Sequence, residues 1–432
     1  MARRLDARAA DFEQQFRALV ESTRDTDEDV SRAVGDIIAD VRARGDAALI
    51  ALSARFDHAA LTPDTLRVAF HEIDDAYRGA DQEVKSALSL AASRIDAYHQ
   101  RQVPLDESFT DDSGARLGWR WTPLQSVGLY VPGGTASYPS TVLMNAIPAR
   151  VAGVPRIVMV TPATGGKINP LTLAAAKLAG ISEIYRVGGA QAVAALAYGT
   201  ATIAPVDKIV GPGNAYVAAA KRAVFGRVGI DSIAGPSEIL VVADAANDPA
   251  WIAADLLAQA EHDPSSQSIL ITDNAGFADK VAAAVDAQLK ELKRRDIAES
   301  SWRTHGAIIV VAKLEDAAAL VDRIAPEHLE IATAEPGAFF DRVKNAGAVF
   351  LGRYSPEAIG DYVAGPNHVL PTSRTARFSS GLSVLDFMKR TSVLACDAGA
   401  LGQLGPAGLT LARAEGLGAH ERSIAIRLNR TR

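Results

Sequence analysis

Short runs of β-branched residues alternate with alanine-rich runs of helical length from Ser126 onward, and this alternation constrains the fold more than any other feature. Such alternation is typical of βαβ units around a parallel sheet. The expected strands of the first series cover residues 127–131, 156–160, 183–187, 208–210 and 238–243. The helices between them are expected to begin near Thr141, Asn169, Ala190 and Asn214.

A second series of the same kind follows further along the chain. Its expected elements are a helix at 249–262, a strand at 268–272, a helix at 276–292, a strand at 307–311 and a helix at 314–324. Two α/β units in one chain usually leave a cleft between them, and ligands usually sit at the carboxyl ends of the strands. We therefore expect a cleft with a ligand site at those ends.

The segment before this alternation reads as helical. Apolar residues recur at helical spacing over 30–41, and a further helix is expected at 82–102. Gly45 is a candidate stop for the first helix, and Asp46 is a candidate cap for the next one.

Two other segments lack this helical pattern. The turn-rich residues 111–114 and the weak alternation over 116–121 predict a β-hairpin. The last fifty or so residues read as loops with a Gly/Pro-rich stretch at 398–408. They resemble a tail that packs on something else.

The composition is that of an ordinary soluble globular protein, with 48% hydrophobic and 22% charged residues. A net charge of -6 argues against a nucleic-acid partner or an anionic membrane surface. The single cysteine, Cys396, cannot form an internal disulfide and favours a reducing compartment. We see no signal peptide after Arg4 and no apolar run near the ~20 residues of a spanning helix. The expectation is a cytoplasmic protein without a nucleic-acid or membrane partner.

Glu327 and His328 are the first candidates for catalysis. They follow Pro326, which should end the preceding helix near Ile324, so we expect the pair on a turn or at the start of the next helix. A carboxylate beside an imidazole can divide labour, one group taking a proton while the other activates water. The alternative is a surface helix start with a favourable N-terminal acid.

A second group of residues could hold a metal. Gln259 and His262 are three residues apart and share one face of the expected helix end. Imidazole is a common zinc ligand and an amide oxygen an unusual one, so the alternative is that His262 only interacts with the helix dipole. Three further segments hold possible ligands, with Asp361, His368, Glu415 and His420.

Three Gly-rich loops, at 130–134, 187–191 and 211–214, each follow an expected strand and open a helix. Backbone N–H groups at such helix starts can face a phosphate. None of the loops completes the Gly-x-Gly-x-x-Gly dinucleotide motif. A nucleotide site and turns that need glycine for geometry alone both remain open.

Together these motifs resemble, in order, those of the histidinol dehydrogenase family. The resemblance extends from about residue 24 to residue 427 and rests on segments 128–134, 187–199, 211–221, 234–238, 259–262, 325–331, 367–372 and 415–420.

This resemblance implies an NAD-dependent, zinc-containing enzyme that oxidises L-histidinol through the aldehyde to L-histidine, the last step of histidine biosynthesis. His328 matches the general base and Glu327 the residue that activates water. One Zn²⁺ per subunit is expected on the residues that match Gln259, His262, Asp361 and His420. The NAD contacts match Tyr130, Gln191 and Asn214. The substrate contacts match Ser237, Gln259, His262, Glu327, His328, Asp361, Glu415 and His420.

The family also implies a homodimer in which the C-terminal tail crosses to the partner's cleft. We predict an α/β protein with two Rossmann-like but incomplete domains, a helical N-terminal segment and a small C-terminal tail domain. The expected division is 1–23 for the N-terminal segment, 24–129 with 238–381 for the metal and acid–base domain, 130–237 for the NAD-binding domain and 382–432 for the tail.

Three other functions remain open. A related zinc/NAD dehydrogenase could act on another diol or amino alcohol. A zinc hydrolase could use Glu327 to drive water at a carbonyl, but it would leave the Gly-rich loops without a role. A non-catalytic binding protein on the same scaffold would gain nothing from keeping both Glu327 and His328.

Overall fold

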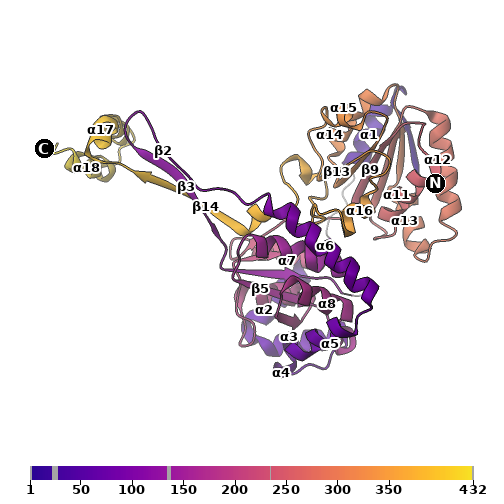
Figure 1. Ribbon diagram of the computed structural model, residues 1–432, viewed down its shortest axis with the longest axis horizontal. Helices are drawn as coiled ribbons and strands as arrows, with labels where there is room; N and C mark the ends of the chain where they lie inside the picture. Colours follow the sequence, from indigo (N-terminus) through magenta and orange to yellow (C-terminus); the bar gives the residue numbers. More distant parts are fainter. Residues whose placement is uncertain (1, 22–27, 134–137, 234, 431–432) are drawn as a thin grey trace.

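The computed structural model describes residues 2–21, 28–133, 138–233 and 235–430. Within them, two fully parallel sheets with helices on their faces form the body, which confirms the predicted α/β class (Figure 1). The expected domain boundary near residue 24, as well as Gly134 and Ala234, lies outside the described residues.

The first sheet has five strands in the order β6-β5-β4-β7-β8. Their bounds are Ser126–Tyr130 for β4, Arg156–Thr161 for β5, Glu183–Arg186 for β6, Lys208–Val210 for β7 and Gly229–Ile230 for β8. The chain runs outward from β4 through β5 to β6 and then returns to the other side of β4 as β7. The strand order therefore reverses between β4 and β7, and such switch points form ligand crevices at the carboxyl edge.

Four helices connect these strands, and they begin within two residues of the predicted starts. They are α7 (Pro139–Val151), α8 (Pro170–Ala179), α9 (Gly189–Tyr198) and α10 (Ala215–Val224). Asn169 and Asn214 cap α8 and α10, because each side chain accepts hydrogen bonds from backbone N–H groups of the first turn.

The N-terminal helices pack on this five-stranded sheet. They are α2 (Glu28–Arg44), α3 (Asp46–Asp57), α4 (Pro63–Leu66), α5 (Phe70–Gly79) and α6 (Gln82–Gln100). Val34 and Val41 of α2 share a core with Val158 and Leu196, because the apolar stripe of α2 faces α9 and α10. This packing differs from the expected grouping of 24–129 with 238–381.

Asp46 does not cap α3 as predicted. It is the first residue of the helix, and its carboxylate accepts hydrogen bonds from Thr202 N at 3.4 Å and Thr202 Oγ1 at 2.6 Å. Gly45 ends α2 with a positive φ of 55°, as expected of a glycine stop.

The second sheet has six strands in the order β1-β11-β10-β9-β12-β13. Their bounds are Arg3–Asp6 for β1, Glu238–Ala243 for β9, Gln267–Thr272 for β10, Ala307–Val310 for β11, His328–Ala332 for β12 and Ala348–Leu351 for β13. The N-terminal segment is therefore not purely helical, since β1 pairs with β11 and buries Leu5 beside Ile309.

Helices cover both faces of this sheet. One face packs on α11 (Pro249–Ala260), α12 (Ala275–Gln288) and α13 (Arg295–His305), and the other on α1 (Phe12–Val20), α14 (Ala317–Ile324) and α15 (Pro336–Phe340). Alternate residues of each strand point to opposite faces, so Leu329 and Ile331 of β12 join the α14 core. His328 and Glu330 consequently point toward the α11 face. The helix α13 was not predicted from the sequence.

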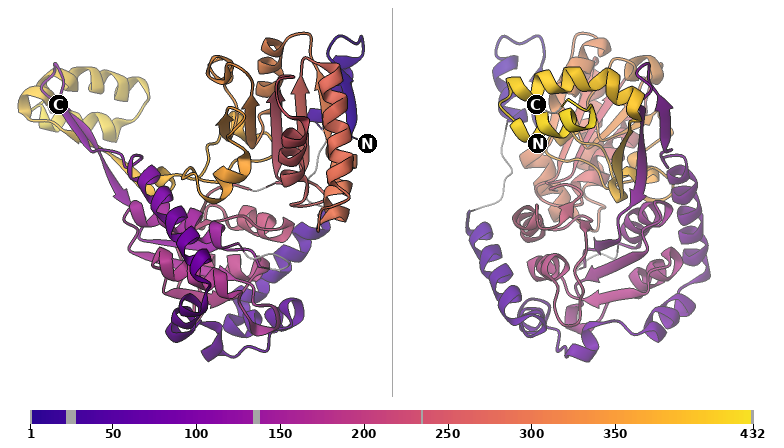
Figure 2. Two further views of the ribbon diagram at one scale, coloured as in Figure 1. Left: turned by 45° about the vertical axis from the view of Figure 1, so that its right-hand side comes forward. Right: turned by 90° about the vertical axis from the view of Figure 1, so that its left-hand side faces the viewer.

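A three-stranded antiparallel sheet forms an arm that projects from the body (Figure 1). It contains β2 (Glu107–Thr110), β3 (Arg116–Pro123) and β14 (Met388–Ala395). The predicted hairpin is thus confirmed, and its second strand also pairs with the C-terminal segment. The arm ends in α17 (Ala398–Ala414) and α18 (Gly418–Arg427), which stand apart from the six-stranded sheet in Figure 1 and in the left view of Figure 2.

The Gly/Pro-rich stretch 398–408 was expected to be a loop but forms most of α17. Its glycines allow close helix packing, because a Cβ on Gly405 would lie 2.7 Å from Leu428 Cδ1. Tertiary contact with α18 therefore outweighs the low helix propensity of glycine. Within the described ranges, no helix combines the length and apolar character that crossing a bilayer requires.

Candidate active site

Glu327 and His328 follow α14, which ends at Ile324 as predicted. Ala325 closes the helix in the left-handed conformation, with a φ of 48°. The expectation of a turn or helix start at His328 was wrong, because His328 is the first residue of strand β12. The following residues alternate between the two sheet faces, and β12 pairs with both β9 and β13.

The site lies at the amino edge of the six-stranded sheet. His328 opens β12, Glu238 opens β9, and Ser237 directly precedes Glu238. We had expected ligands at the carboxyl ends of the strands, whereas in this sheet the candidate residues lie at the amino ends. The helices α11 and α14 end at this edge, and each is followed by a strand of the sheet.

The imidazole of His328 is buried and has a fixed orientation. Its Nδ1 lies 3.0 Å from the carbonyl oxygen of Glu238, which can only accept a hydrogen bond, so Nδ1 carries the proton in the neutral ring. Nε2 has no hydrogen-bond partner among the described residues. Burial lowers the pKa of His328 to about 4, while the charge of Asp361 opposes this shift. His328 is therefore a neutral base with a free lone pair at neutral pH.

Glu327 is held by the same residue of β9. Its Oε2 accepts a hydrogen bond of 2.8 Å from Glu238 N and lies 3.8 Å from His328 Nδ1. The backbone N–H and C=O of Glu238 thus orient the carboxylate and the imidazole together. This gives the pair the fixed geometry that acid–base catalysis requires.

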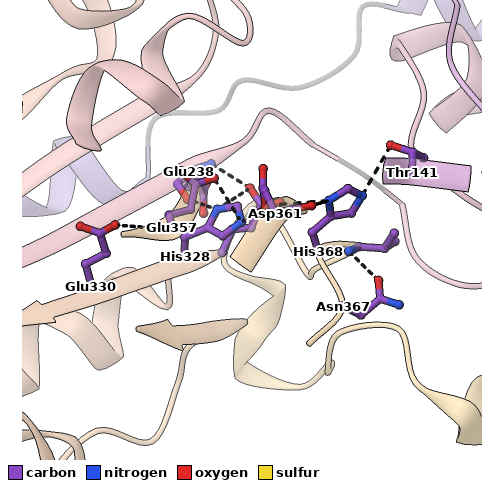
Figure 3. A network of polar contacts seen from close by, with 10 residues as sticks. Thr141, Glu238, His328, Glu330, Glu357, Asp361, Asn367 and His368 are labelled. Atoms are coloured by element: carbon purple, nitrogen blue, oxygen red, sulfur yellow. Dashed lines mark hydrogen bonds and ion pairs between the residues drawn. The ribbon is translucent and has the colours of Figure 1, made fainter. Parts of the chain in front are cut away.

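Two carboxyl groups of α16 (Glu357–Tyr362) face His328 Nε2 (Figure 3). Glu357 Oε1 and Asp361 Oδ1 each lie 3.8 Å from that nitrogen. One ligand atom from each of these three residues lies within 4.8 Å of the others. Burial, and then the charge of Asp361, raise the pKa of Glu357 well above its usual range. Glu357 was not predicted from the sequence, although its four-residue spacing from Asp361 could have indicated a shared helix face.

Three of the four predicted zinc ligands belong to this edge. Gln259 is fully buried in α11, and neither amide atom has a hydrogen-bond partner among the described residues. Burying an amide without a hydrogen-bond partner costs about 1–3 kcal/mol of stability. The Gln259 side chain therefore fits a metal ion that its oxygen coordinates. Burial lowers the pKa of His262, and the negative charge of Asp361 opposes this shift. The two side chains therefore interact electrostatically. Imidazole and carboxylate groups are ordinary zinc ligands, and the amide oxygen of Gln259 would be an unusual one.

The fourth predicted ligand does not reach this site within one chain. His420 lies on α18, and Glu415 follows the last residue of α17, so both are at the end of the arm (Figure 1). Both residues are exposed. The structure of a single chain therefore separates these two residues from the other predicted site residues.

The segment that contains Asn367 and His368 lies between the two sheets and borders the candidate site. His368 Nδ1 lies 3.0 Å from Asp361 O, and His368 Nε2 lies 3.5 Å from Thr141 Oγ1 of α7 (Figure 3). Asn367 donates a 2.6 Å hydrogen bond to Met144 O of the same helix. These contacts join the two α/β units along a cavity of about 940 Å³ that includes His328, Asp361 and His368.

The predicted NAD residues gather at the carboxyl edge of the five-stranded sheet. Tyr130 ends β4, Gln191 lies in the first turn of α9, and Asn214 precedes α10. The hydroxyl of Tyr130 accepts a 3.0 Å hydrogen bond from Gly189 N, and burial raises the pKa of Tyr130 to about 12. This edge contains the switch point between β4 and β7, where α/β sheets bind ligands.

A family model for histidinol dehydrogenase matches residues 20–428. The chain belongs to the histidinol dehydrogenase family. It is 64% identical over 431 residues to histidinol dehydrogenase of Rhodospirillum rubrum, covering 100% of this chain and 99% of that protein. It is 63% identical over 429 residues to the Rhizobium meliloti protein, covering 99% of each.

A solved structure agrees with this assignment. Histidinol dehydrogenase from Elizabethkingia anophelis superposes with a TM-score of 0.94 at 37% identity, covering 99% of this chain and 98% of that one. The histidinol dehydrogenase match includes every predicted site residue but begins after β1. Family membership makes the protein an oxidoreductase.

Two further carboxyl groups, those of Glu330 and Asp255, lie next to the residues of the candidate active site. Glu330 lies on the same face of β12 as His328, and its Oε1 accepts a 2.5 Å hydrogen bond from Glu357 N (Figure 3). It also forms a hydrogen bond with Asp255 of α11. Burial, and then the charge of Asp255, raise the pKa of Glu330 well above its usual range, while burial raises the pKa of Asp255 to about 6. The pair therefore shares a proton.

We expect Glu330→Gln to flatten the pH dependence of stability. The folded protein retains the Glu330 proton that the unfolded chain releases above its ordinary pKa of 4.5. Wild-type stability should therefore fall as pH rises from there toward the raised pKa, by up to about 1.4 kcal/mol per pH unit. The glutamine amide cannot ionise, and its oxygen still accepts from Glu357 N. Urea unfolding from about pH 5 to pH 8 measures the difference.

Glu299→Gln is the control, because Glu299 of α13 is partly exposed and forms i,i+4 ion pairs with Arg295 and Arg303. Its pH profile should follow that of the wild type. Parallel profiles for Glu330→Gln and the wild type would show that Glu330 ionises like a surface carboxyl group.

Proposed function

We propose that the protein is a cytoplasmic, NAD-dependent enzyme that oxidises L-histidinol through L-histidinal to L-histidine, the last step of histidine biosynthesis. The observation that carries this proposal is the oriented pair Glu327–His328 beside the cavity, in a chain of the histidinol dehydrogenase family. His328 Nε2 has no hydrogen-bond partner among the described residues.

The first half-reaction needs a base. As the hydride leaves the alcohol carbon for the nicotinamide, the hydroxyl proton passes to His328 Nε2, and the products are the aldehyde, NADH and a proton. The imidazole is neutral before this step because burial lowers its pKa to about 4. Its Nδ1–H···O bond to Glu238 keeps the accepting nitrogen directed at the substrate.

The second half-reaction adds water to the aldehyde. Glu327 accepts a proton from the attacking water, and the resulting gem-diolate loses a second hydride to another NAD and becomes the carboxylic acid. Glu327 then releases its proton to solvent. The two steps remove four electrons in total. Glu327 is suited to this role because the Glu238 N–H group fixes one oxygen without neutralising the carboxylate.

The proposed zinc ligands are Gln259, His262, Asp361 and the partner subunit's His420. When bound, zinc supplies an electrophilic anchor for the imidazole and amino nitrogens of the substrate. The unpaired amide of Gln259 and the electrostatic link between His262 and Asp361 support this set. Ser237, at the same sheet edge, is a proposed substrate contact together with the partner subunit's Glu415.

A homodimer with exchanged tails would complete this set. The arm holds Glu415 and His420 away from the cleft of their own chain (Figures 1 and 2). Large apolar side chains on the arm and its two helices are exposed, among them Leu394, Leu411, Leu417 and Ile426. Exposed apolar groups of this kind are typical of an interface. NAD is proposed to bind at Tyr130, Gln191 and Asn214.

The formation of NADH on adding L-histidinol tests the function directly. We expect an absorbance increase at 340 nm that accounts for two NADH per histidinol consumed, and much slower turnover with other diols or amino alcohols. Efficient turnover of another diol with none of histidinol would reassign the substrate. A zinc hydrolase would release a hydrolysis product without forming NADH.

We expect His262→Asn to lower bound zinc and activity together, because a site that loses one of its ligands becomes labile. Metal analysis after gel filtration, together with histidinol turnover, measures both. The control is His71→Asn on the exposed side of α5, which should retain both. If His262→Asn retains stoichiometric zinc and full activity, His262 is not a metal ligand and only interacts with the helix dipole.

A further inference from the structure

A buried ion pair lies beneath the loop at residues 211–214. Lys221, in the second turn of α10, contacts Asp231, which follows β8, and their side chains are only 2% and 5% exposed. Neither residue has a role in the chemistry described above, and neither belongs to the active-site edge of the six-stranded sheet.

Both charges hold the backbone of one residue, Gly211. Lys221 Nζ donates a 3.0 Å hydrogen bond to Gly211 O, and Gly211 N donates a 2.7 Å hydrogen bond to Asp231 Oδ2. Charged partners make these bonds stronger than neutral ones. The N–H and C=O groups of Gly211 are therefore fixed by two buried side chains from different elements.

Gly211 needs such support because its conformation is unusual. Its φ is 112°, and a Cβ at this position would lie 2.2 Å from Tyr130 O, so only glycine fits against the end of β4. Three residues later, the side chain of Asn214 accepts hydrogen bonds from Tyr216 N and Val217 N and opens α10. The loop is thus held at both ends, directly at the switch point between β4 and β7.

Stability alone does not account for a buried ion pair here, because well-packed apolar residues in place of such a pair are often equally stable. The two charges also fix the orientation of the Gly211 backbone N–H and C=O groups. We propose that Lys221 and Asp231 are positioning residues that fix the loop at 211–214 for the dinucleotide. This inference rests on the proposed binding of NAD at Tyr130 and Asn214.

The test compares NAD affinity with histidinol affinity in the holoenzyme. Lys221→Met with Asp231→Leu removes both contacts to Gly211 without leaving a lone buried charge. We expect the Kd of NAD, from calorimetric titration, and the KM of NAD to rise at least about tenfold, because two hydrogen bonds to charged groups are lost. The KM of histidinol and the zinc content should stay within about twofold of the wild type, since a displaced loop at 211–214 leaves the other sheet edge intact.

A milder variant keeps the test valid if that one does not fold. Lys221→Met with Asp231→Asn retains an acceptor for Gly211 N, so its NAD affinity should lie between those of the wild type and the apolar variant. The matched control is Lys208→Met, at the opposite end of β7, which loses an ion pair with Asp386. Its NAD affinity should be unchanged.

The outcomes separate the inference from the proposed function. Wild-type NAD affinity in a folded Lys221→Met/Asp231→Asn enzyme would overturn the inference alone. Equal losses of NAD and histidinol affinity would also overturn it, because they indicate a general structural role. A wild-type enzyme that does not bind NAD would overturn the proposed function and the inference together.

Discussion

Replacing His328 with asparagine should slow the oxidation of histidinol by about 10²–10⁴-fold, the loss typical of a missing general base. The amide of the new side chain can still donate a hydrogen bond toward Glu238 O, but it cannot take a proton at neutral pH. The effect should appear in kcat, since His328 accepts its proton during the reaction and not on binding. Stopped-flow measurement of the first NADH formed isolates this step.

Glu327→Gln provides the comparison, because it changes the neighbouring group on the same Glu238 backbone. It should slow the aldehyde-to-acid half more than the alcohol half, since only the aldehyde needs activated water. The two halves are measured separately with L-histidinol and L-histidinal. Equal losses in both halves for Glu327→Gln would contradict the division of labour. An alcohol step at the wild-type rate in His328→Asn would exclude His328 as the base.

Mixing two inactive variants should restore activity if the tails are exchanged. His328→Asn and His420→Asn homodimers should each be nearly inactive. In a hybrid, the cleft with intact His328 receives the partner's intact His420, while the other cleft carries both lesions. Random pairing after joint unfolding and refolding should restore about a quarter of the wild-type sites. Turnover at a fixed total protein concentration measures the recovery.

The control is a mixture of His328→Asn with Glu327→Gln. Residues 327 and 328 of a given chain lie in the same cleft. Hybrids of these two variants contain one damaged residue in each cleft and should regain nothing. Hybrid content is verified by mass spectrometry with one variant isotopically labelled. No recovery with His328→Asn and His420→Asn hybrids present would mean that His420 serves its own subunit.

Local patterns predicted most of the α/β core. Strands such as β5 and β10 have continuous apolar runs of strand length, and Asn169 and Asn214 mark helix starts through their own side chains. These signals depend only on neighbours in the chain. For the same reason His328 was misplaced: its strand is short, and only pairing with β9 and β13 makes it extended.

The rest depended on contacts between distant segments. The glycines of α17 read as loop residues until α18 packs against them. Glu357 and Glu330 are separated by 27 residues and meet through one backbone hydrogen bond. Which sheet edge carries the site depends on how the helices connect the strands, and no local pattern records it. Residue patterns marked Glu327, His328 and the possible metal ligands as candidates, and the family resemblance assigned their roles. Neither assigned a role to Lys221 or Asp231.

The amino edge of the six-stranded sheet and the carboxyl edge of the five-stranded sheet differ in electrical polarity. At the amino edge of the six-stranded sheet, α11 and α14 present their partially negative carboxyl ends beside the carboxylates of Glu327 and Asp361. At the carboxyl edge of the five-stranded sheet, α9 and α10 present partially positive amino ends. Under the proposed function, the cationic amino alcohol and the anionic dinucleotide are thus attracted to different sheet edges before either makes a contact. High salt should weaken this electrostatic attraction of each reactant to its own sheet edge. Without high salt, the reverse arrangement of the two reactants is disfavoured from the first encounter.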